Sequence, residues 1–290
     1  MIKKAVIPAA GFGTRMLPAS KTVPKEMLTL VDRPAISYVV EEAIASGIED
    51  ILIITSRGKG VMEEYFVPHF ELESKLAASG KTEELARLKK LTEIGNIHFI
   101  YQKEQKGLGH AIRCAKAFTG DDPFAVILAD DIVYNDGTPA TKQLMDAYDK
   151  LGGTILGVQY IDDKNISKYG VIKPEEIEKG LFKVTDMAEK PKVEEKMSNF
   201  AALGHYILTP DIYDAIDNTT PGVGGEIQLT DAIRKLIAED KVFAVDFEGK
   251  RYDTGNRLGY MKASVEYALR NDEIGEDFKA YLKEIMKNID

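Results

Sequence analysis

The residues best suited to chemistry form a glycine-containing turn close to the N-terminus. Residues 8–18 read P-A-A-G-F-G-T-R-M-L-P and follow a short apolar run. Gly11 and Gly13 allow positive φ angles and let a ligand approach the main chain closely. Successive backbone N–H groups in such a turn can bind phosphate oxygens, and Arg15 and Lys25 add one forked and one compact positive charge. This stretch therefore predicts a polyphosphate-binding site.

Two better-known glycine motifs do not fit this turn. A dinucleotide-binding fingerprint requires a third glycine at position 16, where this chain has Met16. A Walker A loop requires Gly-Lys-Ser/Thr at its end, and no such sequence follows. A plain dinucleotide-binding module is therefore disfavoured. A tight strand-to-helix turn that carries only surface charges stays open as the simpler alternative.

Carboxylates at the end of a strand offer a second kind of chemistry. Asp130 and Asp131 directly follow the apolar strand expected at 124–128. In an open α/β sheet such positions face the ligand crevice, and Mg²⁺ is usually held by one or two carboxylates together with substrate phosphates. Asp253, in Y-D-T-G near the end of the chain, is either a second metal contact or a residue that starts the next helix.

Polar residues in the second half are candidates for binding a sugar phosphate. Lys190 and Glu189, in A-E-K-P, offer a point charge for a phosphate and a carboxylate for sugar hydroxyls. Gly170 lets a flat ligand approach the backbone, and Glu226 follows two glycines that could line a sugar pocket. The plain alternatives are an exposed turn at E-K-P and a helix start with acids in its first turn at Glu226.

Gln102 and Gly107 are candidates for binding a base. Gln102 follows an expected strand, and its amide can both donate to and accept from the edge of a base. Gly107 would let the base lie against the backbone. The four histidines show no metal-ligand spacing, and there is neither a G-x-S-x-G motif nor a cysteine–histidine pair to argue for, so covalent catalysis is not indicated.

Composition limits the class of protein. The chain has 290 residues and a net charge of −9, which argues against general nucleic-acid binding. The single cysteine, Cys114, excludes an intrachain disulfide framework. No apolar run reaches the roughly 18 residues of a membrane span, and the N-terminus leads into the first strand without a signal peptide. We expect a cytoplasmic protein whose partners are small molecules, with neither nucleic acid nor membrane among them.

The elements that must position these residues alternate between apolar strands and amphipathic helices. Strands are expected at 5–7, 51–54, 97–100, 124–128, 154–161, 204–208 and 242–247, with a turn between strands at 179–180. Helices are expected at 36–44, 108–118, 138–151, 212–216, 227–238 and 256–269. Alternating βα units predict an α/β fold with a largely parallel, doubly wound sheet and right-handed crossovers.

Two segments stand apart from this alternation. Residues 67–95 read as two charged helices, longer than a usual connection, which should pack on the outside or on a neighbouring subunit. Residues 271–290 read as a charged amphipathic helix for packing or oligomer contact. We expect 1–270 to form a single domain, with a nucleotide-binding half at about 1–150 and a sugar-phosphate half at about 151–270.

The motifs together resemble those of a known enzyme family. G-x-G-T-R-x-x-P with the downstream P-K-E resembles the signature of the sugar-nucleotide pyrophosphorylases, which join a nucleoside triphosphate to a sugar 1-phosphate. L-A-D-D, Y-G-V-I, A-E-K-P, G-G-E-I-Q-L-T-D and Y-D-T-G-N-R-L-G-Y occur in the same order as in the bacterial uridylyltransferases of that family. The resemblance runs from residue 3 to about residue 269. It implies a Rossmann-like three-layer α/β/α nucleotidyltransferase with a mixed, mostly parallel central sheet.

The resemblance also implies a reaction and roles for residues. The substrates would be UTP and glucose 1-phosphate, the products UDP-glucose and pyrophosphate, and the assembly a homodimer or homotetramer. Uridine would be held by Ala10, Gly11, Glu26, Gln102 and Gly107, the triphosphate by Gly13, Thr14, Arg15 and Lys25, and Mg²⁺ by Asp130. Glucose 1-phosphate would be held by Gly170, Glu189 and Lys190, with Tyr206 and Glu226 as further contacts and Asp253 as a second metal ligand. Catalysis would depend on Arg15, Lys25, Asp130 and Lys190.

Two alternatives remain within this resemblance. Thymidylyl-transferring relatives share the glycine turn, but they usually have an arginine near the place of Gly224 and a shorter connection where this chain has residues 67–95. Both differences favour uridylyl transfer. Catalytically silent regulatory relatives tend to lose the Thr-Arg pair of the turn, which is intact here at Thr14 and Arg15.

Overall fold

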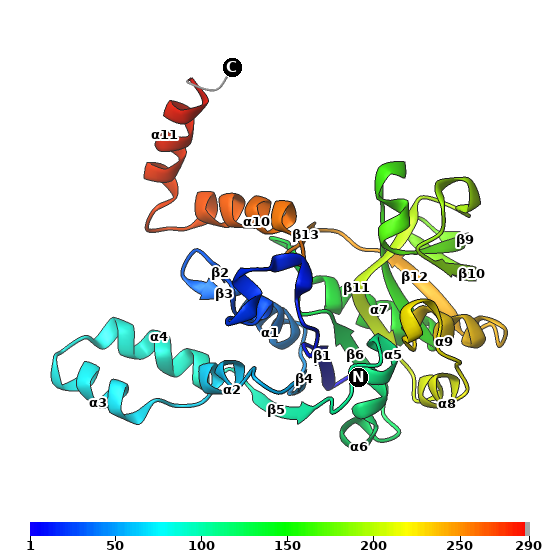
Figure 1. Ribbon diagram of the computed structural model, residues 1–290, viewed down its shortest axis with the longest axis horizontal. Coiled ribbons are helices and arrows are strands. Elements are labelled where there is room, and N and C mark those ends of the chain that lie inside the picture. Colours follow the sequence, from blue (N-terminus) through cyan, green and yellow to red (C-terminus); the bar gives the residue numbers. More distant parts are fainter. Residues whose placement is uncertain (288–290) are drawn as a thin grey trace.

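Short apolar runs of the sequence form a nine-stranded sheet in the computed structural model, which describes residues 1–287 (Figure 1). Its strands are β1 (Lys4–Pro8), β4 (Asp50–Thr55), β5 (Asn96–Tyr101), β6 (Phe124–Ile127), β8 (Thr154–Tyr160), β9 (Gly170–Glu178), β10 (Leu181–Glu189), β11 (Phe200–Leu208) and β12 (Val242–Asp246). Two ribbons pair β2 (Thr29–Leu30) with β3 (Arg33–Pro34) and β7 (Asp131–Tyr134) with β13 (Lys250–Asp253).

Helices surround this sheet and fill the connections. They are α1 (Ala35–Ala45), α2 (Val61–Phe66), α3 (Phe70–Ala78), α4 (Thr82–Thr92), α5 (Leu108–Cys114), α6 (Lys116–Thr119), α7 (Ala140–Leu151), α8 (Asp211–Asp217), α9 (Leu229–Ile237), α10 (Arg257–Arg270) and α11 (Gly275–Met286). None of the helices within residues 1–287 is long and apolar enough to cross a membrane.

The sheet is mixed, as the family resemblance implied. Its order is β5-β4-β1-β6-β11-β8-β12-β10-β9. The pairs β5–β4, β4–β1, β1–β6 and β8–β12 are parallel, and the other neighbouring pairs are antiparallel. These pairings mean that seven of the nine strands run in one direction, while β11 and β10 run in the opposite direction. The carboxyl ends of β5, β4, β1 and β6 therefore lie at one edge of the sheet.

Alternate residues of each central strand enter two separate apolar layers, because both faces of the sheet are covered. Ala5 and Ile7 of β1 face a layer that includes α1, α7 and Ala263 of α10. Val6, between them, faces a second layer built with α5, α8 and α9. This arrangement is the three-layer α/β/α architecture that the resemblance implied.

Several element boundaries differ from the sequence prediction. The helix expected at 108–118 is divided at Ala115 into α5 and α6. The helix expected at 227–238 begins only at Leu229, because the Ile227 N–H donates to Lys106 O at 2.8 Å, a contact between distant segments. The strand expected at 204–208 starts earlier, at Phe200, and the short helix α2 was not predicted.

The two segments set apart by the sequence also lie apart in space. α3 and α4 contain no buried residue and project from one end of the sheet (Figure 1). α11 contacts α10 and otherwise leads away from the body of the molecule (Figure 1). The residues of α11 form the central part of the helix predicted at 271–290. The last three residues of that prediction lie outside the described part of the chain.

Candidate active site

Loops after four parallel strands meet at one edge of the sheet and carry many of the candidate residues. Residues 9–28 follow β1, residues 56–60 follow β4, residues 102–107 follow β5 and residues 128–130 follow β6. Ligands of open α/β sheets bind at this edge. The order of the strands thus explains why residues more than one hundred positions apart in the chain can serve one site.

The glycine turn after β1 has one glycine in the conformation that only glycine adopts readily. Gly13 has φ 67° and ψ 31°, directly before the 3₁₀ turn η1 (Thr14–Met16), and its carbonyl accepts a hydrogen bond from Ser20 Oγ at 2.7 Å. Gly11 differs from the prediction, because its φ is not in the positive region. No atom lies within 4 Å of a Cβ placed at Gly11, so the turn is open to solvent there.

Lys25 and Asp130 form a close charge contact beside the glycine turn. Lys25 Nζ lies 2.5 Å from Asp130 Oδ2, and both side chains are about one-quarter exposed or less. Burial lowers the pKa of Lys25, but the nearby carboxylates of Asp130 and Glu26 outweigh it and raise that pKa above its usual value. Burial likewise raises the pKa of Asp130, and Lys25 outweighs it, so this pKa is lowered. Both groups are therefore charged at neutral pH.

The ribbon of β7 and β13 brings a second carboxylate to Asp130. Its register places Asp253 opposite Asp131, and the Thr254 N–H donates to Asp130 O at 2.8 Å. A Cβ added at Gly255 would overlap Asp130 Oδ2 and lie 3.1 Å from Asp253 Oδ1, so the two carboxylates flank one point. Asp253 does not start a helix, because the side chain that caps α10 is Asn256, which accepts from the Gly259 N–H at 2.9 Å.

This pair of carboxylates fits a hard divalent cation that also binds substrate phosphates. Within residues 1–287, no three His, Cys, Asp or Glu side chains are grouped so that they could hold a metal ion by themselves. Asp130 and Asp253 supply two carboxylates, which matches the usual share of the protein at a magnesium–phosphate site. The Lys25 ammonium already lies against Asp130, so a cation is accommodated there.

A cavity of about 270 Å³ collects half of the predicted site residues. Its lining includes Arg15, Asp130, Gly170, Glu189, Lys190, Tyr206, Glu226 and Asp253. The lining does not include Ala10, Gly11, Gly13, Thr14, Lys25, Glu26, Gln102 or Gly107, which belong to the loops after β1 and β5. The cavity thus combines every residue predicted for the sugar phosphate with both predicted metal ligands.

The sugar-side residues are held by contacts among themselves. Lys190 Nζ lies 2.7 Å from Glu189 Oε1, and Thr230 Oγ1 donates to Glu189 Oε2 at 2.7 Å. A Cβ at Gly170 would lie 3.3 Å from Thr230 Oγ1 and 3.4 Å from Glu189 Oε2. Glu189 is therefore oriented by two neighbours, while the exposed Lys190 can exchange its partner for a phosphate.

On the base side, the loop after β5 is joined to the segment before α9. Gln102 is buried, and its Nε2 donates to Gly107 O at 3.3 Å and lies 2.9 Å from His110 Nδ1. A Cβ at Gly107 would lie 2.8 Å from both Glu226 Cβ and Ile227 O. Glycine is thus required here by the 226–227 segment, a reason that the sequence analysis did not foresee.

Sequence reasoning missed a buried lysine beside Glu26. Lys59, in the loop after β4, donates to Ala9 O at 2.6 Å and to Glu26 Oε2 at 2.9 Å. Burial lowers the pKa of Lys59. The other oxygen, Glu26 Oε1, is buried and has no hydrogen-bond partner among residues 1–287. In the sequence, Lys59 is one of two basic residues in the loop at 56–60, and no local pattern distinguishes it.

A second group that the sequence analysis missed lies behind Asp253. Arg251 forms a two-point ion pair with the buried Asp131, with Nη2 to Oδ2 at 2.7 Å. The guanidinium of Arg251 also lies 4.8 Å from the ring centre of Tyr169. Residues two positions apart lie on the same face of a strand, as Arg251 and Asp253 do in β13, but no strand was expected at 250–253, so Arg251 was not singled out.

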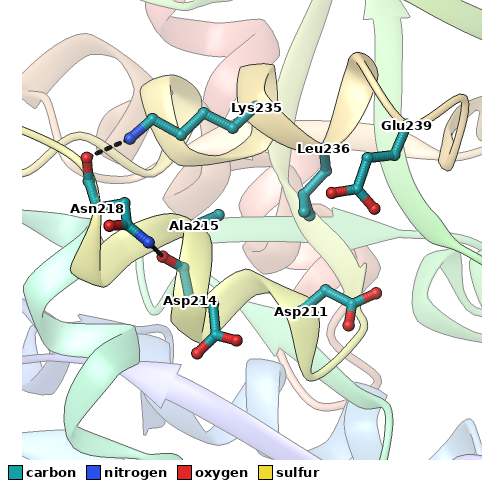
Figure 2. A pocket seen from close by; sticks show the side chains of 7 residues that line it. All are labelled: Asp211, Asp214, Ala215, Asn218, Lys235, Leu236 and Glu239. Carbon is teal, nitrogen blue, oxygen red and sulfur yellow. Dashed lines mark hydrogen bonds between the residues drawn. The ribbon is translucent and has the colours of Figure 1, made fainter.

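Another hollow of similar volume lies on the outside of the molecule, between α8 and α9 (Figure 2). Asp211, Asp214 and Glu239 give it an acidic lining, and the Lys235 ammonium donates to Asn218 O at its rim (Figure 2). None of the predicted site residues lines it. This hollow therefore contains none of the candidate chemistry.

Comparisons with known proteins identify the family of this chain. The family model for nucleotidyl transferases matches residues 4–270. A UTP–glucose-1-phosphate uridylyltransferase of Staphylococcus epidermidis is 49% identical over 284 residues, which cover 98% of each chain. A UTP-bound UGPase from Acinetobacter baumannii has a TM-score of 0.91 and 38% identity, covering 98% of this chain and 99% of that one. A UDP-glucose pyrophosphorylase complexed with UDP-glucose has a TM-score of 0.86 and 43% identity, covering 93% of this chain and 100% of that one.

Proposed function

This chain belongs to the nucleotidyl transferase family, and from that premise we propose that it is a UTP–glucose-1-phosphate uridylyltransferase. It forms UDP-glucose and pyrophosphate from UTP and glucose 1-phosphate. The observation that carries this proposal is the single cavity that contains Arg15, Asp130 and Lys190. Two positive side chains and a carboxylate pair at the carboxyl ends of parallel strands suit the meeting of two phosphate groups.

The reaction is a displacement at phosphorus. A phosphate oxygen of glucose 1-phosphate attacks the α-phosphorus of UTP in line, a new P–O bond forms, and the bond to pyrophosphate breaks on the opposite side. The attacking oxygen is already ionised near neutral pH, since the second pKa of a phosphate monoester is about 6. No general base is needed, and because one phosphoanhydride replaces another, the reaction runs in both directions.

The main obstacle is repulsion between two anions, and the residues of the cavity address it. Arg15 and Lys25 bind oxygens of the triphosphate, and Lys190 binds the phosphate of the sugar, so both reactants are oriented and their charge is screened. Lys25 contacts Asp130 in this structure. It must therefore exchange at least part of that contact for a phosphate oxygen when UTP binds.

Nucleotidyl transferases of this family generally use a divalent metal. We propose Mg²⁺ for this chain, held by Asp130 and Asp253, because paired carboxylates beside substrate phosphates are a usual magnesium environment. When bound, the ion would neutralise charge on phosphate oxygens and help to orient them.

The remaining assignments are proposals of the same kind. Uridine would contact Ala10, Gly11, Glu26, Gln102 and Gly107, and the triphosphate would also contact Gly13 and Thr14. Glucose 1-phosphate would contact Gly170, Glu189, Tyr206 and Glu226. We further propose a cytoplasmic homodimer or homotetramer in which residues 1–270 form one domain and 271–290 contribute to packing.

The test is pyrophosphate release in the presence of Mg²⁺ and glucose 1-phosphate, with UTP, dTTP, CTP, ATP and GTP offered in parallel. The proposal expects release with UTP well above release with any other nucleotide. Preference for dTTP would support the runner-up, a glucose-1-phosphate thymidylyltransferase, with fold and mechanism unchanged. Folded protein that releases no pyrophosphate with any nucleotide would contradict the proposal and favour a catalytically silent relative.

A further inference from the structure

Asp253 is held by a neutral partner. Tyr169 Oη donates to Asp253 Oδ2 at 3.0 Å, and the Gly255 N–H donates to Asp253 Oδ1 at 3.0 Å. No ion pair joins Asp253 to a lysine or arginine within residues 1–287. A neutral hydrogen bond sets the direction of a carboxylate without cancelling its charge. Asp253 is thus oriented and still available to a cation.

Tyr169 is itself fixed from behind by Arg251. Arg251 Nη1 donates to Tyr169 Oη at 3.2 Å, and the guanidinium lies over the tyrosine ring. With this donor on its oxygen, the hydroxyl of Tyr169 directs its own hydrogen toward Asp253. Asp131 holds Arg251 in a two-point ion pair, so the charge of the arginine is balanced away from Asp253.

The same tyrosine is tied to the sugar side of the cavity. The Lys190 N–H donates to Tyr169 O at 3.1 Å, and Gly170, the next residue, begins β9. Tyr169 therefore connects the backbone of Lys190 and Gly170 with the carboxylate of Asp253. A movement of the sugar-side loop would change the hydrogen bond that orients Asp253.

From these contacts we infer that Tyr169, held by Arg251, is a positioning residue that orients the Asp253 carboxylate toward the metal of the nucleotide complex. This inference rests on the proposed function, and it adds a residue that acts through Asp253. Loss of an outer partner of a metal ligand commonly reduces metal affinity by about 10- to 100-fold. We expect the lower end of that range, because the Gly255 N–H still holds Asp253 Oδ1.

The experiment compares Tyr169→Phe with wild type, using Mn²⁺ as the probe. Mn²⁺ is titrated calorimetrically into each protein with saturating UDP-glucose, and the apparent Mg²⁺ requirement of the forward reaction is measured separately. We expect about tenfold weaker Mn²⁺ binding and a raised Mg²⁺ requirement, with kcat at saturating Mg²⁺ much less affected. Tyr160→Phe, which alters an exposed tyrosine of β8, is the matched control and should leave both values unchanged.

A third variant, Asp253→Asn, separates the possible outcomes. If it weakens Mn²⁺ binding while Tyr169→Phe does not, Asp253 binds the metal without help from Tyr169 and the inference is wrong. A Tyr169→Phe variant with a raised KM for glucose 1-phosphate and unchanged Mn²⁺ affinity would instead make Tyr169 a direct sugar contact, which also overturns it. Thermal unfolding of each variant checks that it is folded. Failure of the proposed function would be seen in the wild type, as absence of turnover with UTP.

Discussion

At the scale of single residues, Asp130 is the carboxylate on which most of the site depends. It pairs with Lys25, its carbonyl receives the Thr254 N–H, and its side chain lies beside Asp253. Asp130→Asn keeps the shape of the side chain and removes its charge. We expect kcat to fall by at least about a hundredfold, as is typical when one contact to transition-state charge is lost. Arg15→Ala should have an effect of similar size, for the same reason.

The measurement is steady-state pyrophosphate release at saturating UTP and glucose 1-phosphate. Asp121→Asn is the control, because Asp121 is an exposed aspartate in the turn before β6. Near-normal turnover by a folded Asp130→Asn or Arg15→Ala protein would contradict the assignment of both residues.

Substitution of Lys190 should impair the use of one substrate only, glucose 1-phosphate. Its ammonium is exposed at the cavity and its charge partner is the adjacent Glu189. Removal of the ammonium in Lys190→Ala takes away a charge that orients the sugar phosphate. We expect a raised KM for glucose 1-phosphate, with UTP binding little changed, in kinetics with each substrate varied in turn. Lys192→Ala removes an exposed lysine two residues away and serves as the control; a defect confined to UTP would count against this role.

Sequence reasoning at this scale found residues that stand in short motifs and missed those that act through space. Asp130 and Lys190 follow strands in recognisable patterns, and both line the cavity. Lys59 and Arg251 belong to the site because they form ion pairs with residues far away in the chain, Glu26 and Asp131 respectively. Burial of their charge is a property of the folded molecule, and no spacing in the sequence reports it.

At the scale of elements, a short backbone contact joins the base side to the sugar side. Ile227 N donates to Lys106 O, and the Gly109 N–H, in the first turn of α5, donates to Ile227 O at 2.9 Å. A Cβ at Gly109 would lie 2.8 Å from Ile227 O and 2.9 Å from Ile227 Cγ2. The contact therefore depends on glycine at this position, and it places the neighbouring Glu226 at the cavity.

Gly109→Ala should displace the 226–227 segment. Extra volume at a closely packed place commonly costs about 1–3 kcal/mol of stability. We expect a several-fold rise in the KM for glucose 1-phosphate and a smaller change for UTP, measured with each substrate varied in turn, together with a lower free energy of unfolding in urea. Gly60→Ala is the matched control, since no atom lies within 4 Å of its Cβ and its φ is −56°. Unchanged kinetics for Gly109→Ala would show that the contact has no role in binding.

Most strands of the nine-stranded sheet and most helices could be predicted, because their apolar periodicity is local, whereas the short strands β2, β3, β7 and β13 were not expected. The expected strand at 51–54 and helix at 36–44 lie within β4 and α1. The pairing of β7 with β13 could not be predicted, although it brings Asp130 and Asp253 together. Strand pairing across more than one hundred residues is set by tertiary packing, and the four-residue strands involved carry too weak a pattern to indicate a partner.

At the scale of the whole molecule, a buried ion pair connects the site with the helical layer behind it. His205 of β11 is fully buried, with Nε2 at 3.0 Å from Glu42 Oε1 of α1 and Nδ1 at 3.3 Å from Leu203 O. A backbone carbonyl and an ionised carboxylate only accept hydrogen bonds, so this geometry favours hydrogen on both ring nitrogens. Glu42 also accepts from Thr141 Oγ1 of α7 at 2.7 Å, and the charge of Asp131 lies near the ring. The imidazolium is thus enclosed by acceptors and anions.

This pair should make stability depend on pH in a defined direction. Burial lowers the pKa of His205, but Glu42 and Asp131 outweigh it, and the folded-state pKa lies above the ordinary 6.5. The stabilisation of the folded protein by protonated His205 is complete below about pH 6.5. It is lost as the pH rises through the raised folded pKa. The pKa of Glu42 is lowered despite burial, because of His205 and Thr141, so its own contribution is lost only on the acidic side of about pH 4.5. Measurements above pH 6 therefore isolate the histidine.

We expect the free energy of unfolding of the wild type to exceed that of His205→Asn most at pH 6. The difference should shrink by up to about 1.4 kcal/mol per pH unit between pH 6.5 and the folded pKa, because the unfolded histidine has lost its proton in this range while the folded His205 keeps it. Urea unfolding of both proteins from pH 6 to pH 9 measures this difference directly. Asparagine does not titrate in that range, so other groups act equally on both proteins and largely cancel. A difference that stays constant or grows as the pH rises would mean that His205 is neutral in the folded protein, and that Glu42 is satisfied by Thr141 without a buried cation.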